Sequence, residues 1–254
     1  MPLQPGAPAR NMAVDEAILR AYAQGLCPPT LRFYTWDPPA VSCGRFQAIE
    51  REIDLEACRA AGVAVVRRPT GGRAVLHEGD LTYAVIAGEE DGLPPGVLPA
   101  YLHLSKGLQR GLLRLGVSAG LHTPRGKAPD RNPACFASPS WYELTVAGRK
   151  VAGSAQRREG AAILQHGSIV ISLAADKFVS LLRFSRPGSE TAKHLTLAAA
   201  GLSEFVPGLA PPALAAALAE GFAEALRVEI HAGSLSPAEE GLAAELEPKY
   251  LVLG

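Results

Sequence analysis

The sequence predicts an α/β protein, because short apolar runs rich in β-branched residues alternate along its 254 residues with stretches of helical periodicity. The clearest strand signal is the buried-type run Val63–Arg67, which is apolar and ends in charge. The clearest helix signal is an amphipathic face that would pack on a sheet: Tyr101, Leu104, Leu108, Leu112 and Leu115. An apolar fraction of 48% is ample for a core, and the length allows one large domain or two small ones.

The N-terminal part begins with a predicted flexible leader over residues 1–10, which contain three prolines. Asn11 is expected to cap a helix over residues 12–24, with Gly25 at the position after the helix end. Further elements follow in order: strands at 31–36 and 40–44, a short helix that Asp54 caps and that ends at Gly62, and strands at 73–77 and 81–86.

The second half begins with a long loop over residues 122–140, and loops of this length are often functional. A hairpin around Ala147-Gly148 and a turn at Glu159-Gly160 then predict a strand meander that ends with the run 163–172. The rest is expected to be mostly helical: Leu214, Leu218, Phe222 and Leu226 mark one helix face, and Ser236 to Glu239 form a capping box for the last helix.

Composition excludes several classes of protein. The 25 basic and 25 acidic residues balance, which argues against a general nucleic-acid binder. We find no apolar run long enough to span a membrane and no secretory signal, so we expect a cytoplasmic protein without a membrane partner. The four cysteines form no CxxC pair and no metal-ligand spacing with histidine, so we expect free thiols and no metal.

Cys135 is the most informative residue. It lies in the loop Asn132–Ser140, which is rich in proline and serine, and a polar stretch, Gly148–Ala155, follows shortly afterwards. A thiol on such a loop with an ammonium nearby is typical of a nucleophile, because a cation favours the reactive thiolate. The alternative is an inert apolar cysteine. The other three read as structural: Cys27, Cys43 and Cys58.

Two further motifs could contact a ligand. The paired glycines Gly71-Gly72, flanked by arginines, allow a close approach and offer N–H groups to an anion or carbonyl, although an ordinary hairpin with solvated arginines fits the pattern equally well. The segment is neither a P-loop nor a dinucleotide fingerprint. Lys150 is either a solvated hairpin lysine or points inward at a ligand. His77 and His166 are either bases or buried, hydrogen-bonded core residues.

Five motifs together resemble the lipoate–protein ligase A family, and within it the cysteine-dependent octanoyltransferases. They are Asn11–Glu16, Arg67–His77, Ala134–Leu144, Gly148–Gln156 and Ile163–Ser168. The likeness runs from about residue 11 nearly to the C-terminus. It implies an α/β (α+β) fold like the catalytic domain of biotin and lipoate ligases, with a mixed β-sheet flanked by helices and an apolar acyl tunnel. Residues 11–254 would form a single catalytic domain with no accessory C-terminal domain.

The resemblance also implies roles for residues. Cys135 would carry the acyl group as a thioester, and Lys150 would lower its pKa. The substrate-binding residues would be Arg68, Thr70, Gly71, Gly72, Arg73, His77, Gly153, Ser154, His166 and Gly167.

The implied reaction moves an octanoyl group from octanoyl–acyl carrier protein to a lysine of a lipoyl domain or of the glycine-cleavage H protein, without a cofactor. One alternative is an ATP-dependent lipoate or octanoate ligase, although ligases usually carry Asn-Asp where this chain has Trp141–Leu144. The others are an amidotransferase between lipoyl domains and a non-catalytic protein that binds acyl groups or their carrier.

Overall fold

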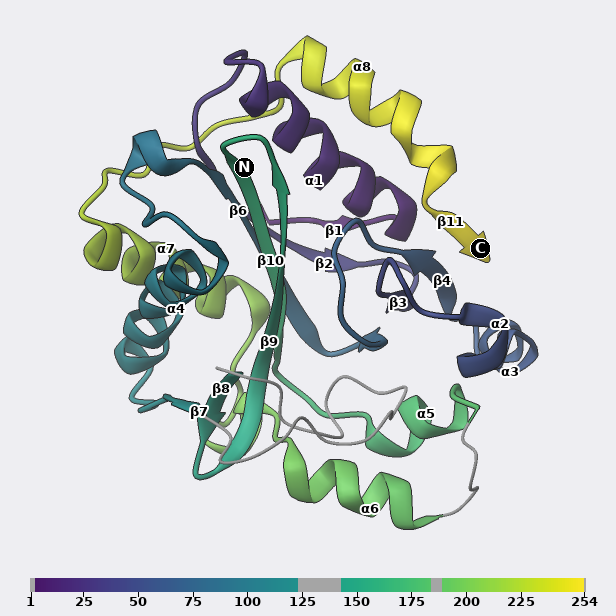
Figure 1. Ribbon diagram of the computed structural model, residues 1–254. Helices are drawn as coiled ribbons and strands as arrows, with labels where there is room; N and C mark the ends of the chain where they lie inside the picture. Colours follow the sequence, from purple (N-terminus) through teal and green to yellow (C-terminus); the bar gives the residue numbers. More distant parts are fainter. Residues whose placement is uncertain (1–2, 123–142, 184–188, 254) are drawn as a thin grey trace.

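The computed structural model describes residues 3–122, 143–183 and 189–253, which form two β-sheets flanked by helices (Figure 1). The larger sheet has the strand order β1 (Pro5–Gly6), β2 (Thr30–Trp36), β6 (Asp80–Ala87), β10 (Ala162–Val170), β9 (Arg149–Glu159), β8 (Glu143–Val146) and β7 (Gly120–His122). The smaller sheet has the order β11 (Leu251–Leu253), β4 (Ala64–Arg67), β3 (Ala40–Cys43) and β5 (Val75–His77). Parallel pairs, β1–β2 and β3–β4, occur beside antiparallel ones, so the predicted mixed architecture is confirmed.

Helices cover both faces of the larger sheet. Helix α1 (Pro8–Ala23) packs on one face and α8 (Pro237–Leu246) packs against α1, whereas α4 (Val97–Arg114) and α7 (Pro211–Leu226) pack together on the other face (Figure 1). Strand β6 is therefore buried throughout: Tyr83 faces the core beneath α4 and α7, whereas Ile86 faces the core beneath α1. A strand covered on both faces has a continuous apolar run in place of alternation.

The two helices α4 and α7 cross closely because of glycine. A Cβ atom added at Gly221 would lie 2.2 Å from the backbone nitrogen of Gly111. Only a residue without a side chain therefore permits this crossing.

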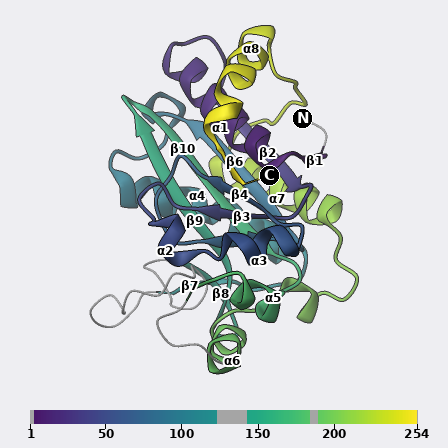
Figure 2. The same ribbon diagram turned by 90° about the vertical axis from the view of Figure 1, so that its right-hand side faces the viewer.

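A third core lies around the smaller sheet, which faces the viewer in Figure 2 together with the two short helices α2 (Ile49–Glu52) and α3 (Leu55–Ala60). Helices α5 (Ala175–Ser180) and α6 (Ser189–Ala198) close the end of the molecule opposite α8. Single 3₁₀ turns occur at Glu89–Asp91, Leu202–Glu204 and Glu247–Lys249. Among the described residues, no helix is both long and apolar enough to cross a membrane.

The predicted caps are confirmed at three helices. The Asp54 carboxylate accepts from the Ala57 N–H at 3.0 Å, Ser236 forms its capping box, and Gly25 has a φ of +69° after α1. The cap at Asn11 is wrong. Helix α1 begins at Pro8, and the Asn11 amide instead donates to the carbonyls of Gly6 and Thr35.

The expected leader also differs from the structure. Residues Pro5–Gly6 pair with β2, and residues 8–10 already belong to α1. The predicted hairpin between β8 and β9 is present, and its central residues Ala147 and Gly148 both have positive φ, 49° and 79°. These are the angles of a type I′ turn, which matches the twist of paired strands. Most of the long loop predicted at 122–140 lies outside the described residues.

Candidate functional site

A cavity of about 220 Å³ lies where the two sheets meet, and both sheets, α1 and α4 line it. Its apolar wall comes from Met12, Tyr34, Trp36, Val75 and Tyr101. Of the ten predicted substrate-binding residues, eight line this cavity: Arg68, Gly72, Arg73, His77, Gly153, Ser154, His166 and Gly167. Thr70 and Gly71 are not among the lining residues. The structure thus brings distant motifs to one site, and substrate binding by these residues stays a prediction.

The glycine segment is held in place by the side chain of Arg68, which is only 7% exposed. Its guanidinium donates to the carbonyl of Gly71 at 2.8 and 3.2 Å and to that of Arg73 at 2.8 Å. The segment also packs tightly against Gly44, the residue after β3, because a Cβ atom at Gly44 would lie 1.9 Å from the carbonyl oxygen of Gly72. Arg68 therefore shapes the loop, and the solvated alternative for this arginine is wrong.

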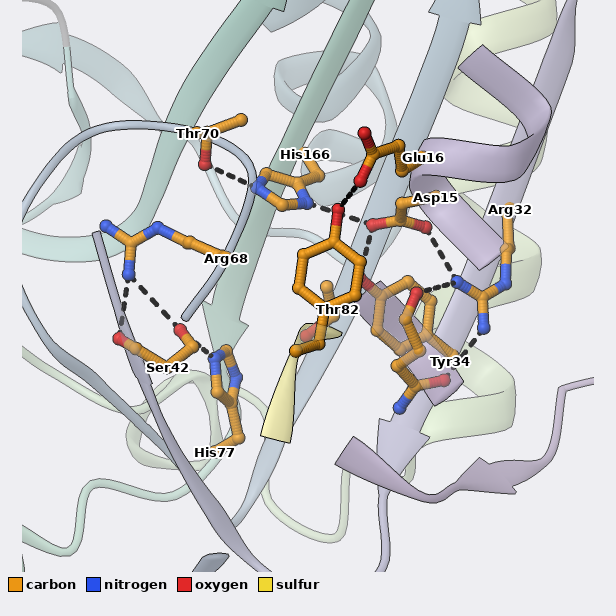
Figure 3. Close-up of polar contacts among 12 residues, drawn as sticks. Asp15, Glu16, Arg32, Tyr34, Ser42, Arg68, Thr70, His77, Thr82 and His166 are labelled. Atoms are coloured by element: carbon orange, nitrogen blue, oxygen red, sulfur yellow. Dashed lines mark hydrogen bonds and ion pairs between the residues drawn. The ribbon is translucent and has the colours of Figure 1, made fainter. Parts of the chain in front are cut away.

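A buried network fixes the same segment from the larger sheet (Figure 3). Thr70 Oγ1 lies 2.7 Å from His166 Nε2, and His166 Nδ1 lies 2.9 Å from Asp15 Oδ2. Arg32 and the Tyr34 hydroxyl also donate to Asp15, at 2.7 and 2.8 Å. Burial alone would raise the pKa of Asp15, but the hydrogen bond from His166 and the charge of Arg32 outweigh it and lower that pKa. An ionised carboxylate only accepts, so His166 donates through Nδ1.

A second hydroxyl–imidazole–carboxylate chain connects the two sheets, from Ser42 on β3 and His77 on β5 to Asp80 on β6, and Figure 3 shows its first two members. Ser42 Oγ lies 2.8 Å from His77 Nε2, and His77 Nδ1 lies 2.8 Å from Asp80 Oδ2, which also accepts from Ser168 at 2.7 Å. The Trp36 ring stacks on His77 at a centroid distance of 4.0 Å. The buried, hydrogen-bonded reading of both histidines is therefore confirmed, and both rings also face the cavity.

Lys150 is only 2% exposed, so the alternative of a solvated hairpin lysine is wrong. Its ammonium forms an ion pair with Glu143, which lines the cavity. The sequence patterns did not indicate Glu143, Asp15, Asp80 or Ser42 as site residues. Glu143 and Asp15 both lie inside motifs of the family resemblance, so the sequence marks their segments. A motif does not indicate, however, which of its side chains contact one another in the folded protein.

Cys135 lies within residues 123–142, outside the described residues, so its role stays a prediction. None of the other three cysteines lines the cavity. Burial is the main cause that raises their pKa values, to about 12 for Cys27 and Cys43 and to about 11 for Cys58. Unreactive thiols of this kind agree with the structural reading. In the part of the chain that the structure describes, no group of three His, Cys, Asp or Glu residues could hold a metal ion.

Comparison with known proteins decides the family. The model of the lipoyl protein ligase A/B catalytic domain matches residues 7–223. The chain belongs to this family. It is 44% identical over 257 aligned residues to octanoyltransferase LipM of Kyrpidia tusciae, covering 97% of this chain and 93% of that protein. It is 43% identical to octanoyltransferase LipM of Moorella thermoacetica, covering 96% of this chain and 91% of that protein.

Among solved structures, the bi-partite lipoate protein ligase of Thermoplasma acidophilum superposes with a TM-score of 0.82 at 26% identity, covering 97% of this chain and 91% of that one. The fold inferred from the motifs is thus confirmed. The names of the LipM relatives also confirm the predicted enzyme class, an acyltransferase.

Proposed function

We propose that this chain is a protein octanoyltransferase of lipoate biosynthesis that carries the octanoyl group as a thioester on Cys135. The observation that carries the proposal is the 44% identity, over 97% of the chain, to a protein named octanoyltransferase LipM. The geometry agrees with it, because an apolar cavity adjoins a buried ammonium, that of Lys150, through the cavity-lining Glu143.

In the proposed first half-reaction, the Cys135 thiolate attacks the thioester carbonyl of octanoyl–acyl carrier protein. A free cysteine has a pKa of about 8.5, so only a few per cent is thiolate at pH 7, and a nearby ammonium raises this fraction. Lys150 stabilises the thiolate and the developing oxyanion, with help from the backbone N–H group of Gly72.

In the second half-reaction, the ε-amine of an acceptor lysine attacks the acyl-enzyme and forms an amide. The acceptor is a lipoyl domain or the glycine-cleavage H protein. Support for a lipoyl domain comes from the related ligase of Thermoplasma acidophilum, which was studied together with its E2 lipoyl domain. Thioester exchange is nearly isoenergetic and amide formation is downhill, so the sequence of reactions needs no ATP.

A second candidate is an ATP-dependent ligase, and the observation that favours it is the fold likeness to a lipoate protein ligase at 26% identity. The two functions differ in their acyl donor. A comparison of donors with one lipoyl-domain acceptor therefore separates them.

The experiment supplies either octanoyl–carrier protein, or free octanoate with ATP and magnesium, or octanoylated H protein, and follows octanoylation of the lipoyl domain by mass spectrometry. We expect product with octanoyl–carrier protein and none with octanoate and ATP. Product only with ATP would establish the ligase, and product only from octanoylated H protein would establish an amidotransferase. Binding without product in any arm would leave a non-catalytic carrier-binding protein.

A further inference from the structure

Glu143 has an incomplete set of hydrogen bonds. It is the first residue of β8, and its side chain is only 5% exposed. Its Oε1 atom accepts from the ammonium of Lys150, whereas its Oε2 atom is buried and has no hydrogen-bond partner among the described residues. Buried polar atoms in folded proteins almost always have a partner, so an open carboxylate oxygen beside a cavity indicates a donor on the ligand.

Glu143 also differs from the other carboxylates near the site. It is the sole acidic residue among the described residues that line the cavity. Asp15 receives donors on both of its oxygens, and Asp80 Oδ2 accepts from three side chains. Glu143 is therefore the carboxylate that remains available to a substrate.

Of the groups that the proposed reaction brings together, one is a nitrogen that must lose protons. A lysine side chain has a pKa of about 10.4, so only about 0.04% of it is the nucleophilic free amine at pH 7. The octanoyl chain and the thioester carbonyl offer no N–H donor, and the neutral amide N–H groups of the carrier's pantetheine arm would pair less strongly with a carboxylate than an ammonium does. The open oxygen of Glu143 thus fits the acceptor amine better than it fits the acyl donor.

We propose that Glu143 Oε2 binds the ammonium of the acceptor lysine and takes a proton from it. This inference rests on the proposed function, because it assigns a catalytic residue to the second half-reaction. Oε1 meanwhile keeps Lys150 in place. One carboxylate therefore serves both ammonium groups, that of the enzyme and that of the substrate.

The step balances as follows. A proton passes from the acceptor ammonium to Oε2, and the freed nitrogen lone pair attacks the thioester carbonyl and forms the C–N bond. The C–S bond breaks, and its electron pair leaves with sulfur. The remaining surplus proton on nitrogen passes to the thiolate, and the proton on Oε2 is released to water. The net products are an amide, a thiol and one proton.

The variant Glu143→Gln tests this assignment by separating the half-reactions. Stopped reactions analysed by intact mass follow formation of the octanoyl-enzyme and its decay with a lipoyl domain. We expect acylation within about threefold of wild type and aminolysis slower by about 100-fold or more, the usual contribution of general base catalysis. Decay with hydroxylamine, which is neutral at pH 7, should be unchanged. Aminolysis by the variant should rise about tenfold per pH unit, with the free-amine fraction.

Two further variants keep the test decisive. Glu143→Asp retains a carboxylate and should recover part of the aminolysis rate. Glu204→Gln removes the carboxylate that pairs with Arg149, the residue before Lys150. Neither Arg149 nor Glu204 lines the cavity, so this control variant should leave both half-reactions unchanged.

Equal slowing of acylation and aminolysis in Glu143→Gln would overturn the inference, because it would mean that Glu143 only holds Lys150. Unchanged aminolysis would overturn it as well. A wild-type protein that never forms an octanoyl adduct would instead overturn the proposed function, and this inference with it.

Discussion

Two buried ion pairs near the cavity differ in how many of their carboxylate oxygens accept hydrogen bonds. Asp15 is paired with Arg32 and also accepts from Tyr34 and His166, so both of its oxygens have donors. Glu143 is paired with Lys150 through one oxygen, and the other has no partner among the described residues. A fully bonded pair is typical of a scaffold, whereas an open buried oxygen is typical of a position that a ligand completes.

The Asp15 pair connects elements that are distant in sequence. Asp15 lies on α1, Arg32 on β2 and His166 on β10, and His166 extends the chain of hydrogen bonds to Thr70 beside the glycine segment. This network therefore fixes one wall of the cavity. The Glu143 pair lies within a single hairpin, and it leaves one carboxylate oxygen open to a ligand.

The largest expected difference between the two pairs is in stability. Asp15→Asn should lower the free energy of unfolding by about 3–5 kcal/mol, because it leaves the buried Arg32 without its counter-ion. Glu143→Gln also leaves a buried cation, the Lys150 ammonium, without its counter-ion, but it should cost less, at about 3 kcal/mol, since Glu143 Oε2 has no hydrogen bond to lose. Urea unfolding at pH 7 measures both. A larger loss of unfolding free energy in Glu143→Gln than in Asp15→Asn would contradict the view that Asp15 belongs to the scaffold and Glu143 to the open site.

A smaller expected effect concerns acid. The lowered pKa of Asp15, against an ordinary value of 3.8, means that its ionised form stabilises the fold. That contribution is complete above about pH 4 and is lost as the pH falls through the lowered pKa. The difference in unfolding free energy between wild type and Asp15→Asn should therefore decrease when urea unfolding is repeated between pH 4 and pH 3. An increase of this difference on acidification would mean that the partners of Asp15 do not keep its carboxylate ionised.

The sequence predicts what local patterns encode. The caps at Asp54 and Ser236 were predictable because each involves a hydrogen bond to a residue three positions away. Asn11 also has the residue type of a cap, but its amide bonds to the carbonyl of Thr35, which β2 brings near only in the folded chain. Local patterns cannot separate these two uses of the same kind of side chain.

The site was predictable in part, for the same reason. The motifs identified Lys150 and the glycine segment, but a lysine after a hairpin turn ordinarily reads as exposed. Its buried ammonium pairs with Glu143 across the hairpin, where a register shift lies between Leu144 and Thr145. Likewise, His166 is 151 residues from Asp15, so no local spacing indicates that the two meet.

The central claim is that one thiol, that of Cys135, carries the octanoyl group, and intact-mass measurement after mixing with octanoyl–carrier protein tests it most directly. Wild type and the matched control Cys27→Ala should each gain one hydroxylamine-sensitive octanoyl group, because the raised pKa of Cys27, about 12, leaves that thiol unreactive. Cys135→Ala should gain none and should not transfer octanoate to a lipoyl domain. Transfer by Cys135→Ala at the wild-type rate would contradict the account.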